Sequence, residues 1–270
     1  MSTGDVDTGL KFLHQVFELK SLHYGLFEPD TPRTIPGVRQ AQANYRAALL
    51  ALVPGEARTV LDVGAGLGDS TRELAASGRR AEGLSPDPYH HEQFTLNCDG
   101  AIPFHLSKFE DFSPGKTYDC LYFGESPQYI DKDRFFPKCV ELTEPGSCLV
   151  VAELFQHREG GPYSTCFFED DFVARAERAG FRVDHHRDIT EEVIPTLEVG
   201  QIFLDFGRRI FDFATTTARA RRPILTRIGR LFYGRRLARL REMVHEKAPA
   251  WLDTDRFRET TRYAMYRFVR

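Results

Sequence analysis

The sequence has no apolar run close to the ~20 residues that a bilayer-spanning helix needs. Its first residues, MSTGDVDTGLKFLHQ, carry acidic side chains where a secretory signal would carry positive charge. The five cysteines are odd in number and lack the paired short spacings of a zinc site. These absences argue against an exported, membrane-spanning or metal-binding protein, and we expect a cytoplasmic chain with reduced thiols and no bound metal.

Charge is low overall but unevenly distributed along the chain. Hydrophobic residues at 41% and charged residues at 28% are typical of globular proteins, so neither disorder nor a fibrous repeat is indicated. The net charge is −3, yet residues 205–245 hold eleven arginines against three acidic residues. That stretch is therefore +8 and the remainder −11, so we expect it to attract phosphates, carboxylates or an anionic membrane surface.

The apolar pattern predicts an α/β fold with a Rossmann-like, seven-stranded, mostly parallel sheet. Short apolar runs alternate with amphipathic helices in the middle of the chain, which is typical of crossover units that cover a sheet on both faces. The closing segment TRYAMYRFV alternates as a strand does. We expect four parts: N-terminal helices and a lid (1–56), a cofactor-binding core (57–189), an arginine-rich helical cap (190–258) and a final strand of the core (259–270).

A glycine-rich turn between the first predicted core strand and the helix after it is the most specific motif. It reads LDVGAGLGDS and places Gly64, Ala65, Gly66 and Gly68 where a ligand binds in open α/β sheets. Glycines let the backbone approach a ligand closely, and the helix N-terminus offers unpaired N–H groups. The spacing lacks the longer gap before the third glycine of a dinucleotide fingerprint, so hydride chemistry is disfavoured.

This run resembles motif I of the class I methyltransferases that depend on S-adenosylmethionine (SAM), and the resemblance extends over about residues 57–188. It implies that the glycine turn lies under the methionyl part of SAM, and that Asp62 orients the amino group of the cofactor. Further motifs follow in the family's order. At the end of the second strand, where the family usually has an acidic ribose ligand, stands Ser85, with Asp87 as its competitor.

The resemblance assigns three more segments to the cofactor. Ser107, Lys108 and Phe109 follow the third strand, where the family binds the adenine ring. Gly124 and Glu125 end the fourth strand, which in this family faces the sulfonium. The segment His23-Tyr24-Gly25 resembles an aromatic segment that precedes motif I in many small-molecule and lipid methyltransferases, which implies that Tyr24 covers the cofactor.

Methyl transfer requires alignment first, and a base only if the nucleophile carries a proton. Glu125 is the first candidate for that base or for stabilising developing positive charge, because a dehydrated carboxylate has a raised pKa. It could instead bond the cofactor loop or the lid. His157, whose ordinary pKa suits proton removal near neutrality, is the second candidate. Glu153 and Tyr129 also follow strand ends and complete the catalytic set.

The resemblance is greatest to the sterol, tocopherol and cyclopropane-fatty-acid branch, which implies a lipid, terpenoid or polyketide-like acceptor from secondary metabolism. Aromatic residues interleaved with arginines in residues 190–258 favour a substrate that is anionic or lipid-like, or a peripheral membrane contact. Carbon, oxygen and nitrogen stay open as acceptor atoms, as does the oligomeric state.

Two alternatives compete with this interpretation. The arginine-rich segment would also suit a nucleic-acid methyltransferase, but the fourth-strand motif GESPQ lacks the Asn/Asp-Pro-Pro-Tyr/Phe tetrad common in amino-directed enzymes of that class, so we expect no nucleic-acid partner. The other alternative is a SAM-binding protein without transfer activity, because a glycine turn indicates cofactor binding rather than turnover.

Overall fold

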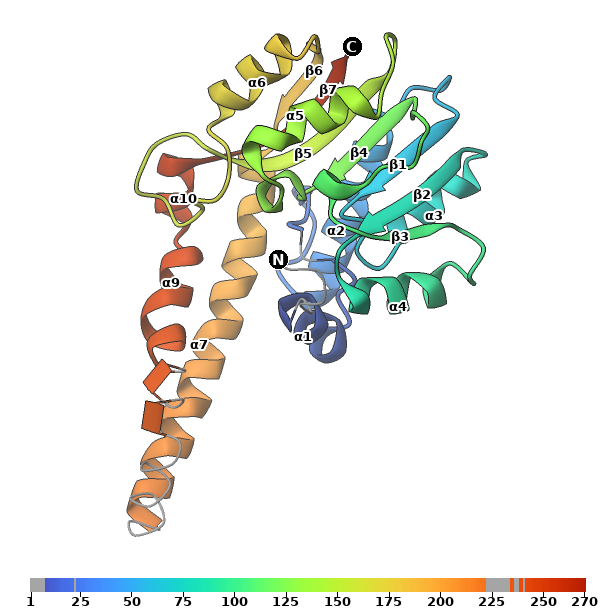
Figure 1. Cartoon of the computed structure of the whole chain (residues 1–270). Coiled ribbons are helices and arrows are strands. Elements are labelled where there is room, and N and C mark those ends of the chain that lie inside the picture. The colour runs from blue at the N-terminus through green and yellow to red at the C-terminus, as the bar shows by residue number, and fades with distance from the viewer. Residues whose placement is uncertain (1–7, 22, 222–233, 236–237, 240) are drawn as a thin grey trace.

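The computed structural model describes residues 8–21, 23–221, 234–235, 238–239 and 241–270. Its centre is one seven-stranded sheet in the order β3-β2-β1-β4-β5-β7-β6, in which β7 alone pairs antiparallel with both of its neighbours (Figure 1). The predicted mostly parallel α/β sheet is therefore confirmed. The strands are β1 (Thr59–Val63), β2 (Arg80–Ser85), β3 (Phe104–Leu106), β4 (Cys120–Gly124), β5 (Cys148–Gln156), β6 (Arg182–Asp188) and β7 (Thr261–Val269).

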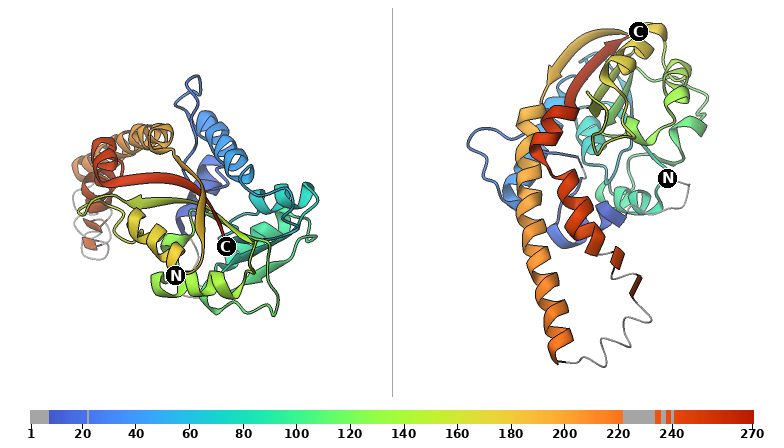
Figure 2. Two further views of the ribbon diagram at one scale, coloured as in Figure 1. Left: turned by 90° about the horizontal axis from the view of Figure 1, so that it is seen from above. Right: turned by 90° about the vertical axis from the view of Figure 1, so that its left-hand side faces the viewer.

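Alternating residues of the central strands serve two separate apolar cores. On β1, Val60 faces one core and Leu61 the other, because successive side chains of a strand point to opposite faces. One core is packed by α2 (Ile35–Leu50), α3 (Asp69–Ala76) and the start of α7 (Thr190–Arg221). The other is closed by α5 (Lys132–Glu141) and α6 (Glu169–Arg178), while α4 (Pro88–Asn97) lies beside β3 (Figure 2).

The insertion before β7 is helical, as predicted, but its described part forms an arm rather than a compact cap. The 32-residue helix α7 packs on the body only with its first turns and then projects away from it (Figure 1). The chain returns along it through a π-helix, η3 (Met243–Lys247), and α9 (Ala248–Trp251), before α10 (Thr254–Thr260) leads into β7. Side chains on the outer half of α7, such as Phe206 and Phe213, are exposed, so this part of the insertion does not cover the core of the body.

Short contacts hold the two sides of this arm together. Gln201 Nε2 donates to the carbonyl of Leu252 at 2.6 Å, and Gly200 leaves room for the Leu252 side chain. Further out, the ring centroids of Phe211 and His245 are 6.3 Å apart. Among the residues that the structure describes, no helix combines the length and the apolar character needed to pass through a bilayer.

The N-terminal helix α1 (Thr8–Phe17) lies against the base of the arm and beside α4. Leu13 and Phe17 pack with Val199 of α7, and His14 Nδ1 lies 2.8 Å from the hydroxyl of Tyr89 on α4. The chain then runs across the carboxyl end of the sheet before it enters α2. Within residues 1–56 the described chain thus forms two helices, α1 and α2, joined by a non-helical segment.

Candidate functional site

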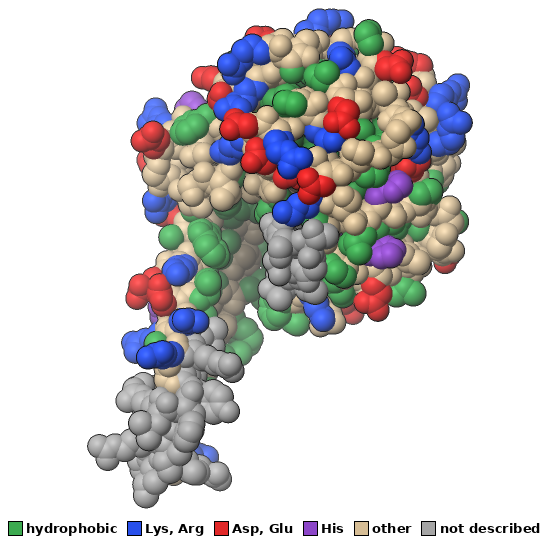
Figure 3. All heavy atoms as spheres, viewed as in Figure 1, with side chains coloured by type: hydrophobic (Ala, Val, Ile, Leu, Met, Phe, Trp, Pro, Cys, Tyr) green, Lys and Arg blue, Asp and Glu red, His purple; other side chains and the backbone are tan. Residues whose placement is uncertain are grey.

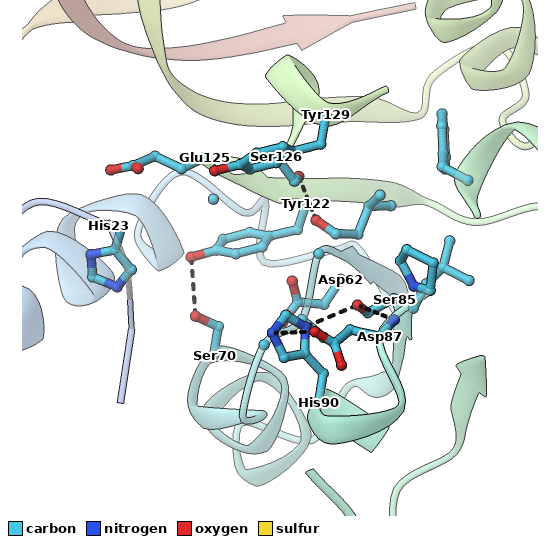
Figure 4. A pocket seen from close by; sticks show the side chains of 18 of the residues that line it. His23, Asp62, Ser70, Ser85, Asp87, His90, Tyr122, Glu125, Ser126 and Tyr129 are labelled. Carbon is cyan, nitrogen blue, oxygen red and sulfur yellow. Dashed lines mark hydrogen bonds and ion pairs between the residues drawn. The ribbon is translucent and has the colours of Figure 1, made fainter. Parts of the chain in front are cut away.

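A cavity of about 210 Å³ opens at the carboxyl ends of β1, β2 and β4 (Figure 4). Parallel strands bring their carboxyl ends to one edge of a sheet, so residues far apart in the sequence meet there. Most of the residues that the sequence singles out line it. They are Asp62, Gly64, Ala65, Gly66, Ser85, Ser107, Lys108, Phe109, Gly124, Glu125 and Tyr129.

The glycine turn uses a left-handed backbone at three positions. Gly64, Gly66 and Gly68 have φ angles of 83°, 54° and 91°, a region that favours glycine. A Cβ on Gly64 would come within 2.5 Å of the Cβ of Ser126, and one on Gly68 within 2.7 Å of the Phe94 ring. Gly64 and Gly68 are thus required by packing, and Gly68 lies outside the cavity lining, where it lets α3 approach α4.

Gly66 is different, because space rather than protein lies beside it. Among the described atoms, a Cβ on Gly66 would meet only the carbonyl oxygen of Gly64, at 3.9 Å. Since this residue lines the cavity, the missing side chain leaves a bare stretch of backbone that a ligand is able to approach.

Two buried carboxylates flank the turn. Asp62, only 3% exposed, accepts a 2.6 Å hydrogen bond from the hydroxyl of Thr71. Burial raises the pKa of Asp62 to about 7, although the bond from Thr71 lowers it. Asp69 begins α3 and pairs through Oδ1 with Lys20 and Arg72, whereas its buried Oδ2 has no hydrogen-bond partner within the described part of the chain. This end of the cavity is suited to a cationic group.

At the end of β2 both candidates for the ribose, Ser85 and Asp87, line the cavity, and Asp87 is also tied to the backbone of α4. Asp87 caps α4, because its Oδ1 accepts a 2.7 Å bond from the backbone N–H of Tyr89. Ser85 Oγ lies 2.9 Å from Nδ1 of His90, and both side chains line the cavity (Figure 4). His90 was missed from the sequence, although its place in the first turn of the helix after β2 was the signal that it faces the strand end.

The segment after β3 contributes to the wall of the cavity. Ser107, Lys108 and Phe109 all line the cavity, and Phe109 is 3% exposed. Its ring meets Phe123 edge-on, with centroids 5.5 Å apart and planes at 85°. Phe109 therefore packs into the core and closes one side of the cavity at the same time.

Glu125 follows β4 with a backbone that is unusual for its residue type. Its φ of 59° lies in the left-handed region, where non-glycine residues are uncommon and mark strained or functional positions. Its Oε1 accepts hydrogen bonds from the backbone N–H of Tyr24, at 2.8 Å, and from the hydroxyl of Tyr263 on β7. Burial raises the pKa of Glu125 to about 7, while these two bonds lower it.

The other catalytic candidates are not all brought to the cavity. Tyr129 lines it and is 63% exposed. Glu153 is fully buried on β5 and accepts from the backbone N–H groups of Gln128 and Leu154; burial and the nearby Glu125 raise its pKa well above the usual range. His157 is exposed beyond β5 and outside the lining, because β5 runs on past the edge where the shorter β4 ends.

Tyr24 also departs from its expected place. Its hydroxyl lies 2.6 Å from that of Tyr163, and the residue is not part of the lining. The neighbouring His23 takes the position on the cavity instead, stacked on Tyr45 with ring centroids 4.2 Å apart. Its Nδ1 donates to the carbonyl of Tyr24 at 2.8 Å, and burial lowers the pKa of His23 to about 4, so the ring is neutral at pH 7.

No protein-family profile matches the sequence. The chain does superpose on solved structures over nearly its whole length. A geranyl diphosphate methyltransferase in complex with geranyl diphosphate and sinefungin gives a TM-score of 0.69 at 15% identity, covering 99% of this chain and 96% of that one. The cyclopropane synthase MmaA2 from Mycobacterium tuberculosis gives 0.62 at 12% identity, covering 93% and 90%.

The [4+2]-cyclase SpnF is similar to the same degree, with a TM-score of 0.68 at 15% identity over 100% of this chain and 99% of that one. The structurally similar proteins therefore differ in activity among themselves. At these identities it establishes the architecture, including the helical insertion before the last strand, and the chain has the fold of the class I SAM-dependent methyltransferases.

Proposed function

We propose that this protein is a SAM-dependent methyltransferase that acts on a small-molecule acceptor. The observation that carries the proposal is the convergence, in one cavity, of the glycine turn, the ends of β2 and β4 and the segment after β3. Each of these segments resembles a cofactor motif of the family, and their meeting in one cavity supports the proposal.

The residues present fit the cofactor. Asp62 and the unpartnered Oδ2 of Asp69 supply negative charge where a cationic amino-acid end would lie, above the bare backbone at Gly66. Ser85 and His90 offer hydrogen-bonding groups for the ribose hydroxyls. The segment Ser107–Phe109 would bind the adenine. SAM, when bound there, supplies the methyl group as a sulfonium.

Glu125 is placed to assist the acceptor. A carboxylate with a pKa of about 7 accepts a proton from a nucleophile near neutrality, or stabilises positive charge that develops on a carbon acceptor. The bonds from Tyr24 and Tyr263 fix Oε1 and hold the side chain in place. Tyr24 would then position this carboxylate rather than touch the acceptor. Glu153 bonds the backbone of Gln128 and Leu154 and would not touch the acceptor, and His157 would not contribute.

The acceptor that we propose is apolar or anionic, of the lipid, terpenoid or polyketide-like kind. The similar structures include one that contains geranyl diphosphate and a cyclopropane synthase, which supports this class. The nucleic-acid alternative gains no support from them. Neutral His23 and the exposed ring of Tyr129 border the same end of the cavity as Glu125, and together they would contact the acceptor.

The test is an acceptor screen read by mass spectrometry. The protein is incubated with SAM and a panel of prenyl diphosphates, fatty acids and polyketide-like phenols, and each is examined for the gain of one methyl group with release of S-adenosylhomocysteine. Calorimetry with SAM runs in parallel. Failure to bind SAM would overturn the assignment of the cavity, whereas binding without any methylated product across the panel would favour a SAM-binding protein or a cyclase.

A further inference from the structure

From Ile202 outward, α7 presents an apolar stripe that the described part of the chain leaves largely exposed. Phe203, Phe206, Ile210 and Phe213 recur at spacings of three and four residues, which places them on one face of the helix. They are 36%, 63%, 52% and 71% exposed, and Ile202 beside them is 59% exposed. The opposite side of α7 is occupied by the returning chain, where Phe211 meets His245.

The stripe continues onto the N-terminal helix. Phe17 of α1 packs against Phe203 with ring centroids 5.1 Å apart and at 65°. On the same short helix Phe12 and Val16 are 55% and 56% exposed. We call the seven residues together the apolar face: Phe12, Val16, Ile202, Phe203, Phe206, Ile210 and Phe213. Side chains of this kind gather along the hollow between the arm and the body in Figure 3.

The charges around the apolar face are mainly positive. Two acidic residues of the outer arm pair with cations, Asp205 with Arg208 at 3.5 Å and Glu242 with Lys247 at 3.1 Å. Asp212 lies 3.3 Å from His245, which is charged only when protonated, and Glu246 makes no ion pair within the described part of the chain. Five exposed arginines make no ion pair within the described part of the chain: Arg209, Arg221, Arg235, Arg239 and Arg241. Residues 205–245 as a whole carry +8 by sequence.

We infer that the arm and α1 dock this protein on an anionic lipid surface, with the apolar face at the depth of the acyl chains near the headgroups and the unpaired arginines among the phosphates. Aromatic residues beside cationic ones are the composition of interfacial helices, and the lack of a spanning helix in the described part of the chain agrees with a peripheral contact.

A second copy of the chain is a less suitable occupant of the apolar face. Pairing two arms along their stripes would bring two segments of +8 together without acidic partners, and like charges repel. An anionic lipid surface instead complements both the apolar stripe and the arginines. Because α1 leads directly into Lys20, Ser21 and His23, which line the cavity, docking would place the cavity close to the lipid.

This inference is independent of catalysis and is tested by co-sedimentation with vesicles. We expect the protein to bind vesicles of phosphatidylcholine with one third phosphatidylglycerol much more strongly than vesicles of phosphatidylcholine alone, and high salt to weaken the binding. The double variant Phe206→Ser, Phe213→Ser should lower binding by at least about tenfold. Each of Arg209→Gln, Arg239→Gln and Arg241→Gln should lower it by about fivefold.

Matched controls lie on the body. Leu96 on α4 is 65% exposed, and Arg80 on β2 is exposed and makes no ion pair within the described part of the chain, so Leu96→Ser and Arg80→Gln test the same chemistry away from the arm. Both should leave binding unchanged. Circular dichroism confirms that each variant is folded.

Three results would overturn the inference: no binding to either vesicle, equal binding to both, or equal losses in the arm and body variants. Sedimentation velocity is measured without lipid on the same proteins. A dimer that the double variant dissociates, together with absent vesicle binding, would assign the apolar face to a second copy of the chain.

Discussion

The backbone N–H of Tyr24 donates a 2.8 Å hydrogen bond to Oε1 of Glu125, which lies 101 positions further along the chain. The bond joins the N-terminal segment to the end of β4, at the edge of the cavity where Glu125 has a left-handed backbone. Tyr263 of β7 donates to the same oxygen. Two segments that are far from β4 in the sequence therefore hold this carboxylate in place. A substitution in either segment should change the hydrogen bonding of Glu125.

Gly66→Val should abolish SAM binding while the protein stays folded. The added side chain would enter the open space beside the turn, where few protein atoms would be displaced. Gly78, with a φ of 88° and nothing within 4 Å, is the matched control, since Gly78→Val carries the same backbone strain away from the cavity. Calorimetry measures the affinity; an equal loss in both variants, or none in Gly66→Val, would contradict the assignment.

Glu125→Gln should lower kcat by about a hundredfold or more and change the affinity for SAM by only a fewfold. The amide keeps the shape of the side chain but neither accepts a proton nor carries negative charge. Steady-state rates are compared with SAM affinity from calorimetry. Equal losses of rate and affinity would show that Glu125 is a cofactor ligand rather than a catalytic group.

Tyr263→Phe should shift the pH dependence of the reaction to higher pH. If Glu125 acts as a base, kcat/KM rises as its carboxyl loses a proton, with a midpoint near pH 7 in the unaltered protein. The hydroxyl of Tyr263 donates to this carboxylate and lowers its pKa, so its removal should raise the midpoint by roughly one pH unit. Tyr266→Phe, on the same strand, should leave the midpoint unchanged because Tyr266 bonds Glu169.

Asp62 should make the cofactor-free protein less stable as the pH rises. Its pKa in the folded chain is raised from 3.8 to about 7, so the stabilising contribution is complete below about pH 4 and is lost as the pH rises to 7. Compared with Asp62→Asn, the loss should reach up to about 4 kcal/mol. Urea unfolding of both proteins at pH 4 and pH 7 measures the difference, and parallel pH profiles would contradict the prediction.

His90→Ala and Asp87→Ala should affect different properties. Loss of His90 removes a group beside Ser85 in the cavity and should weaken SAM binding about tenfold. Loss of the Asp87 carboxylate removes the cap of α4 and should lower the free energy of unfolding by about 1 kcal/mol. Calorimetry and urea unfolding separate the two effects; a larger loss of affinity in Asp87→Ala would identify it as the ribose ligand instead.

The order of the strands along the chain and the place of the cavity followed from the sequence. The turn around Gly64 and Gly66 is recognisable because its backbone requirement is local, and the alternation of apolar runs is set by the period of each element. The segment Ser107–Phe109 and Gly124 line the cavity as expected, since their positions depend only on where a parallel strand ends.

Other features were decided by the tertiary structure alone. The hydroxyl of Tyr24 contacts that of Tyr163, and His23 rather than Tyr24 lines the cavity. Strand β5 extends beyond the edge at which β4 ends, so His157 lies outside the cavity lining. Burial also sets the pKa values of Glu125 and Asp62, because desolvation depends on every segment packed around a carboxyl group. A sequence records the periodicity and turn chemistry of each segment, whereas side-chain direction and dehydration arise only when distant segments pack together.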